Sequence, residues 1–273
     1  MLDVSTTILD IFSVGSINEK FSMFDSLKDR IEMISSSENL SSIDFDKFSK
    51  GFSQISILSE LEAVEPQRVK ARKNLQSNEG KAVMVHAIAH IEYSAFELAL
   101  QTAFLGQGLG PGYLQDWFRV AGEEKRHFLL LQNHLENLGY SYGSFSVHLS
   151  LFEGAGRAGS LLERLAIVHR YQEANGLDAN PALIRRLERH QPHDNGFIEK
   201  FIDTLEIILE DEIGHVALGD KWFRKLCPVG IDAEELYFDI ITRVYPNRKQ
   251  QGDRLNLSAR QEAGFSVIEL QRL

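Results

Sequence analysis

The chain has 273 residues, of which 43% are hydrophobic and 25% charged, values ordinary for a soluble globular protein with a substantial core. Its net charge of −10 at pH 7 argues against broad, non-specific binding to nucleic acid. Cys227 is the only cysteine, so a disulfide framework and a cysteine-based zinc site are excluded.

The start of the chain and its apolar runs favour a cytoplasmic protein. Residues 1–12 have no basic segment followed by a long apolar run, so no signal peptide is expected. No stretch offers about 20 uninterrupted apolar residues, and no membrane span or membrane partner is predicted.

Residues 1–76 are rich in serine and hold short amphipathic pieces. In residues 17–34, apolar side chains recur at helical spacing, at Phe21, Phe24, Leu27 and Ile31. Residues 45–61 and 66–75 are weaker helical candidates. We therefore expect residues 1–76 to form a helical N-terminal extension that packs against a second domain, residues 77–273, or touches a partner.

The second domain begins with strongly helical sequence. A helix is predicted over residues 78–105, ended by the glycines and proline of residues 106–111, and another over residues 112–138. Residues 139–159 lack helical periodicity and are long enough to be the crossover of a ferritin-like bundle.

Two more long helices follow the predicted crossover. One begins near Ser160, breaks at residues 175–176 and resumes from Pro181 to about residue 190; the other spans about residues 195–223. A further helix is expected at 233–244, and the polar tail 246–273 holds a short final helix.

Two Glu-x-x-His motifs lie at the centres of predicted helices, at Glu124–His127 and Glu212–His215. Residues three apart share a helix face, so each pair can grip a metal ion. Two such pairs, with one lone glutamate from each of two more helices, form the ligand set of dinuclear carboxylate sites. The sequence therefore predicts an all-α protein, a ferritin-like four-helix bundle with additional N- and C-terminal helices.

The lone glutamate of the first hairpin is predicted from helix lengths. Glu92 lies about 20 Å before the end of its helix and Glu124 about 18 Å after the start of the next, so the two are level. Glu97 would be about two turns short and is the reserve ligand. In the second hairpin Glu173 is the predicted ligand, with a helix break just beyond it so that Glu173 comes level with Glu212.

The predicted roles follow from coordination chemistry. Glu124 and Glu212 would bridge two metal ions, each ion also bound by a histidine, with Glu92 and Glu173 as terminal ligands. Carboxylates and imidazoles without thiolates suit iron or manganese and can also hold zinc; iron is the metal we expect. Glu123 and Asp211 are candidate hydrogen-bond partners of the ligand histidines. His169 is either an extra ligand, a partner of a ligand or a buried structural histidine.

A single Glu-x-x-His motif arises by chance on charged helices, and surface ion pairs on an ordinary bundle are the competing interpretation. Two motifs on two long helices, with an acidic residue in each of the other two, favour the metal site.

The arrangement of Glu92, Glu124, His127, Glu173, Glu212 and His215 resembles the ferritin-like di-iron carboxylate superfamily. Four stretches within about residues 78–268 resemble the bacterial domain-of-unknown-function 455 family: His90-Ile-Glu92, Glu173-Ala-Asn-Gly-Leu-Asp178, Asp211-Glu-Ile-Gly-His-Val216 and Leu255-Asn-Leu-Ser-Ala-Arg-Gln-Glu-Ala-Gly-Phe265. That family is related to tRNA hydroxylases that modify isopentenyl-adenosine. Asn175 departs from the family pattern, which has arginine there, and we expect an altered pocket entrance.

The leading functional hypothesis is a non-haem di-iron oxidoreductase that uses O₂ to oxidise or hydroxylate an organic substrate, either a small molecule or a modified tRNA base, with an external electron donor. Iron storage or peroxide scavenging, and a non-enzymatic helical interaction module, are the alternatives. A homodimer is left open.

Overall fold

The computed structural model describes residues 4–34, 43, 45, 61–69, 75–190, 196–247 and 255–273. Within these residues the fold is all-α, as predicted, and the only β pairing is an isolated bridge between Ala63 and Val147. The chain divides into two compact units, residues 1–156 and 157–273. The predicted ferritin-like bundle and the predicted boundary at residue 76 stay predictions.

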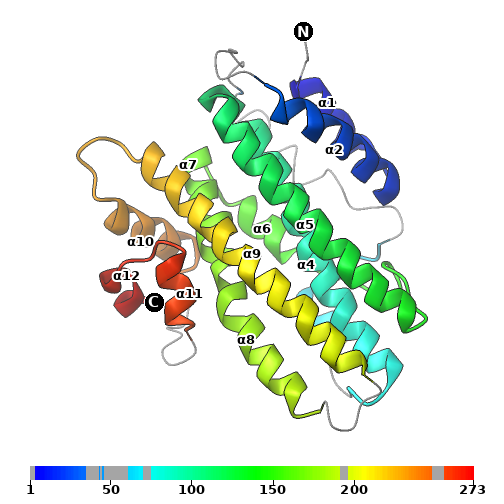
Figure 1. Cartoon of the computed structure of the whole chain (residues 1–273). Coiled ribbons are helices and arrows are strands. Elements are labelled where there is room, and N and C mark those ends of the chain that lie inside the picture. Colours follow the sequence, from blue (N-terminus) through cyan, green and yellow to red (C-terminus); the bar gives the residue numbers. More distant parts are fainter. Residues whose placement is uncertain are drawn as a thin grey trace. The chain divides into compact units, whose positions relative to one another are not determined.

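The first unit is built on two long helices, α4 (Asn78–Leu105) and α5 (Pro111–Asn137), which lie side by side (Figure 1). The Ser77 hydroxyl accepts a hydrogen bond from the Gly80 N–H and caps α4, and a proline begins α5, where its missing N–H costs nothing. Only the short 3₁₀ helix η2 (Gln107–Leu109) separates them, so the two helices run antiparallel. Both agree with the predicted ranges to within a residue or two.

Two N-terminal helices, α1 (Val4–Ser13) and α2 (Ile17–Glu32), pack on α4 and α5. Phe21 and Phe24 of α2 each meet the Phe96 ring edge-on, with centroids 5.1 and 5.2 Å apart, so the predicted amphipathic face of α2 is the one buried. Helix α1 was not predicted.

Two weaker N-terminal predictions have different outcomes. Residues 45–61 lie almost entirely outside the described residues. The described part of 66–75 holds only the 3₁₀ helix η1 (Pro66–Arg68). The predicted crossover, in turn, contains a short helix, α6 (Ser150–Ala155), that sequence periodicity did not indicate.

The second unit begins with α7 (Leu161–Arg164), capped by Ser160, followed by the π-helix η3 (Leu165–Gln172) and α8 (Ala174–Glu188). Helix α9 (Phe197–Leu226) packs against η3 and α8 (Figure 1). Helix α10 (Ala233–Val244) has the predicted bounds, and the tail holds two short helices instead of one, α11 (Leu257–Glu262) and α12 (Val267–Arg272).

The predicted helix break at residues 175–176 is wrong. Gly176 and Pro181 both lie inside α8, and the irregularity precedes Glu173. Pro181 leaves the carbonyl of Leu177 without its usual helical donor, and the Asn256 side-chain amide donates to that carbonyl at 3.2 Å. A contact from the distant tail thus satisfies the group that the proline frees, which no local pattern predicts.

Among the described helices, none combines the length and the apolar character that crossing a membrane requires.

Candidate metal centre

The first unit brings Glu92 of α4 together with Glu124 and His127 of α5. The Glu92 Oε2 atom lies 3.1 Å and the Glu124 Oε2 atom 3.5 Å from His127 Nδ1, and one candidate ligand atom from each of the three residues falls within 4.8 Å of the others. Their exposed fractions are 4%, 0% and 0%. This buried group, which we call the first ligand set, can hold a metal ion.

Burial and mutual repulsion govern the protonation of the first ligand set. Loss of solvation, opposed by the hydrogen bond from His127 and reinforced by the charge of Glu124, raises the pKa of Glu92 to about 7. Burial lowers the pKa of His127, but hydrogen bonds to Glu124 and Glu92 outweigh it and raise this pKa to about 11. Without a metal ion, a protonated His127 therefore balances part of the carboxylate charge.

Glu97, the reserve ligand, lies in a different cluster. Its Oε1 atom is 3.3 Å from Lys20 Nζ of α2, with both side chains fully buried, and it accepts a hydrogen bond from the Tyr93 hydroxyl. Lys20 Nζ also donates to the carbonyl of Ile11 at 2.9 Å. Glu97 thus ties the N-terminal helices to α4, and the structure does not place it with Glu92.

His86 and His90 of α4 make hydrogen bonds with the segment after α5. His90 Nε2 is 2.9 Å from the His148 carbonyl, which can only accept, so Nε2 carries the proton and Nδ1 accepts from the Tyr142 hydroxyl at 2.8 Å. His86 Nε2 accepts from the Gly143 N–H at 3.0 Å. Burial lowers the pKa of each histidine to about 4, so both are neutral, structural residues.

The second unit holds the other predicted ligands. On α9, Glu212 Oε2 and His215 Nδ1 are 3.9 Å apart, and both side chains are buried. His169 Nδ1 forms a 2.7 Å hydrogen bond to Glu173 Oε1, while Glu173 Oε2 has no hydrogen-bond partner among the described residues. We call Glu173, Glu212 and His215 the second ligand set.

Glu173 lies at the end of a wide turn. Its N–H donates to the Val168 carbonyl, five residues back, at 3.1 Å, as in a π-helix. Such segments are rare and often occur at functional sites. Here the wide turn ends at the residue predicted as a ligand and contains His169, which bonds that residue.

The predicted partners of the ligand histidines have different surroundings. Glu123 pairs with Arg119 at 3.5 Å on the partly exposed side of α5. Asp211 is half-buried on α9. His169 is fully buried and bonds Glu173, and its role as an extra ligand, a partner of a ligand or a structural histidine stays a prediction.

Sequence reasoning missed two features around these residues, the π-helix and the Lys20–Glu97 ion pair. Nothing in the periodicity of residues 165–172 distinguishes a π-helix from an α-helix. A signal for the ion pair did exist, since Lys20 interrupts the apolar face of residues 17–34 and Glu97 lies in an otherwise apolar part of α4.

The fold and these residues define an all-helical protein with a buried carboxylate–histidine group suited to a metal ion. The profile of the family described as "Protein of unknown function (DUF455)" matches residues 15–271, and the chain belongs to this family. An uncharacterised protein of Haemophilus influenzae is 38% identical over 218 residues, which cover 76% of this chain and 72% of that protein. No solved structure matches the chain.

Proposed function

We propose that this protein is a non-haem di-iron oxidoreductase that uses O₂ to oxidise or hydroxylate an organic substrate. The six residues of the first and second ligand sets would hold two metal ions, with Glu124 and Glu212 among their carboxylate ligands. Iron fits a set of carboxylates and imidazoles without thiolate, as manganese and zinc also can.

One observation carries the proposal, the burial of two carboxylates beside each other in the first ligand set. Glu92 and Glu124 are almost entirely withdrawn from water, and His127, which lies between them, can offset at most one of their two negative charges. Removing ionised groups from water costs several kcal/mol each unless they are paired or bind a cation. A bound divalent cation would compensate both carboxylates.

Each residue has a chemical task in this proposal. In the metal-free chain His127 holds a proton, and Glu92, with its pKa raised to about 7, holds one in part of the molecules near neutral pH; both would be released when a metal ion binds, because ligands must be deprotonated. Burial keeps water away from the first ligand set, since Glu92 is 4% exposed and Glu124 and His127 are fully buried. Bound iron would supply the electron transfer and O₂ chemistry that protein side chains lack.

The substrate class follows from the resemblance noted in the sequence. A small organic molecule or a modified tRNA base is proposed, with an external donor that supplies electrons. The net charge of −10 favours the small molecule, because a tRNA would meet a predominantly acidic chain.

The test is metal analysis of protein from iron-supplemented cells, followed by anaerobic reduction and exposure to O₂ with absorption spectra recorded. About two iron atoms per chain and an O₂-dependent spectral change support the proposal. Glu124→Ala and Glu212→Ala should abolish both, and Glu136→Gln, an exposed change on the same helix as Glu124, should affect neither. A chain that stays metal-free after reconstitution with ferrous ions refutes it, and uptake of many iron atoms per chain would indicate storage.

A further inference from the structure

The C-terminal segment, residues 255–273, contacts the two consecutive helices that flank Glu173, η3 before it and α8 after it. One contact reaches Arg170, three residues before Glu173; the other reaches Ala174 and Asp178, one and five residues after it. The first lies in η3 and the second in α8, so the contacts bracket the junction between the π-helix and the α-helix.

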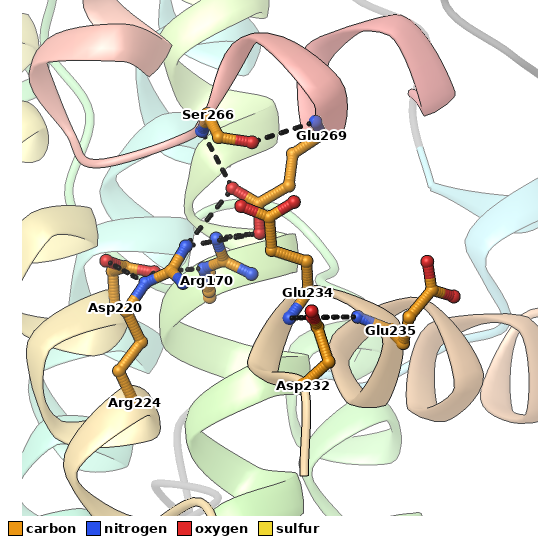
Figure 2. Close-up of polar contacts among 8 residues, drawn as sticks. All are labelled: Arg170, Asp220, Arg224, Asp232, Glu234, Glu235, Ser266 and Glu269. Carbon is orange, nitrogen blue, oxygen red and sulfur yellow. Dashed lines mark hydrogen bonds and ion pairs between the residues drawn. The ribbon is translucent and has the colours of Figure 1, made fainter. Parts of the chain in front are cut away.

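The contact before Glu173 is a network of four charges, of which three are buried and the fourth, Arg224, is partly exposed (Figure 2). Arg170, fully buried, has its Nε atom 2.7 Å from Asp220 and donates from its terminal nitrogen to Glu269 at 2.6 Å. Arg224 bonds the same two carboxylates, at 2.9 and 3.2 Å. Two arginines thus face two acids, so the network is neutral and each charge is compensated.

Aromatic rings and a helix cap hold this network in place. The Arg170 guanidinium lies 4.1 Å from the Tyr237 ring and 4.6 Å from the Phe265 ring. Glu269 accepts a 2.8 Å hydrogen bond from the Ser266 N–H while the Ser266 hydroxyl caps α12 (Figure 2). The position of Glu269 is therefore fixed by its own helix.

The contact after Glu173 comes from α11. Arg260 donates to both oxygens of Asp178, at 3.0 and 2.5 Å, and to the Ala174 carbonyl at 3.0 Å. The Asn256 N–H donates to Asp178 at 2.8 Å, and its side chain bonds the carbonyl freed by Pro181. These bonds anchor the first turns of α8 directly behind Glu173.

Two glycines let the elements meet closely. A Cβ atom at Gly219 of α9 would come within 2.6 Å of the His169 carbonyl oxygen, so α9 touches η3 through backbone at the residue that bonds Glu173. At Gly264, where φ is +98°, a Cβ atom would lie 2.8 Å from Asp220. Residues 255–265, which were singled out in the sequence, thus supply Asn256, Arg260, Gly264 and Phe265 to the contacts on the two sides of Glu173.

We propose that the C-terminal segment is a clamp that positions Glu173 against Glu212 and His215. Glu269 and Arg260 are its positioning residues, acting through Arg170 and Asp178. The buried charges hold the π-helix in the position in which His169 and Glu173 bond each other. Asp220 belongs to α9, so the same network also fixes the position of α9, which carries Glu212 and His215. The metal-binding consequence of the clamp rests on the proposed function; the positioning itself does not.

The test compares Glu269→Gln, which removes the charge with little change of shape, with Glu235→Gln. Glu235 of α10 pairs at 2.7 Å with Arg272, which lies in α12 as Glu269 does. This ion pair is on the exposed surface and away from Arg170, so Glu235 is the matched control. Arg260→Met tests the other side of the clamp. Should Glu269→Gln not fold, the Arg260→Lys variant, which keeps the charge and loses the fork geometry, takes its place.

The first measurement is backbone hydrogen exchange of the metal-free full chain over residues 166–178. Glu269→Gln and Arg260→Met should speed exchange there by at least about tenfold, as expected if about 1.4 kcal/mol of local stability is lost. Glu235→Gln should leave it unchanged. Unaltered exchange in both clamp variants overturns the proposal.

The second measurement is the affinity for Co²⁺, whose visible spectrum reports its coordination. Loss of a residue that orients a ligand typically lowers metal affinity 10- to 100-fold, and we expect about tenfold with an altered spectrum. Faster exchange with unchanged affinity and spectrum would show a merely structural role and overturn the clamp as a positioning device. A wild-type chain that binds no Co²⁺ or Fe²⁺ would refute the proposed function, and the exchange data would still decide whether the clamp holds Glu173.

Discussion

Replacing Glu124 with glutamine should affect the metal-free and metal-loaded protein in opposite directions. In the metal-free chain, burial and the charge of Glu124 contribute to raising the pKa of Glu92 from 4.5 to about 7. An increase of this size corresponds to about 3 kcal/mol against the ionised form, and we assign about 1 kcal/mol of it to Glu124, because burial is the larger cause. The glutamine amide oxygen can still accept from His127 Nδ1, which lies 3.5 Å from Glu124 Oε2, so the contact that helps raise the pKa of His127 is kept. Glu124→Gln should therefore stabilise the metal-free protein by about 1 kcal/mol, or raise Tm by about 2–4 °C.

With metal present the sign reverses. A ligand at about 1,000 times its Kd stabilises the folded state by about 4 kcal/mol, so Mn²⁺ should raise the wild-type Tm by about 8–16 °C. The glutamine variant should lose most of this increment, because an amide is a weaker ligand than a carboxylate and cannot balance the cation's charge.

The assay is thermal unfolding of both proteins with chelator and with Mn²⁺, and Glu136→Gln on the exposed side of α5 is the control. A variant that is less stable than wild type without metal, yet retains the full metal-induced shift, would refute the reasoning. It would show that Glu124 stabilises the fold as an ordinary buried partner of His127.

Three further predictions concern protons and buried charge. Metal affinity should rise with pH between 6 and 8, because His127, with its pKa raised to about 11, must release a proton before it can bind the ion. The rise should be about tenfold per pH unit for each proton displaced, and an affinity that titrations find independent of pH would contradict this. The free energy of unfolding should fall as pH drops from 6.5 towards 4, because His90 takes up a proton in the unfolded chain but, with its pKa lowered to about 4, stays neutral in the folded one. Urea unfolding at pH 5 should therefore show about 2 kcal/mol less loss of stability in His90→Gln than in wild type. Equal losses in the two proteins would count against this explanation. Lys20→Met should cost about 3–5 kcal/mol by leaving the Glu97 carboxylate buried without its cation, and adding Glu97→Leu should recover most of that cost; a double variant no more stable than the single one would exclude this account.

The long helices of the first unit were predictable because their signals are local. Ser77 and Pro111 mark helix starts, and the short connection forces α4 and α5 to run antiparallel. Counting residues from that connection then placed Glu92 level with the first Glu-x-x-His motif, and the structure has Glu92 within 3.1 Å of His127.

The second unit was less predictable because its shape depends on distant contacts. The sequence around Gly176 and Pro181 has the composition of a helix end, and the helix nevertheless continues because Arg260 and Asn256, about 80 residues later, bond its first turns. Likewise, the π-helix is stabilised through Arg170 by Asp220 and Glu269. No window of local sequence contains these partners.

The two ligand sets differ in how their lone glutamates are held, and this difference has a chemical consequence. Glu92 bonds the histidine of the motif itself, so a metal ion that takes both must first remove the proton between them. Glu173 instead bonds His169, a residue outside the motif, through Oε1 and leaves Oε2 without a partner among the described residues. Glu173 can therefore donate Oε2 to a metal ion and keep its bond to His169. The proton release that makes metal binding depend on pH should accordingly arise chiefly from Glu92 and His127, and the second ligand set should depend on the clamp that holds Glu173 in position.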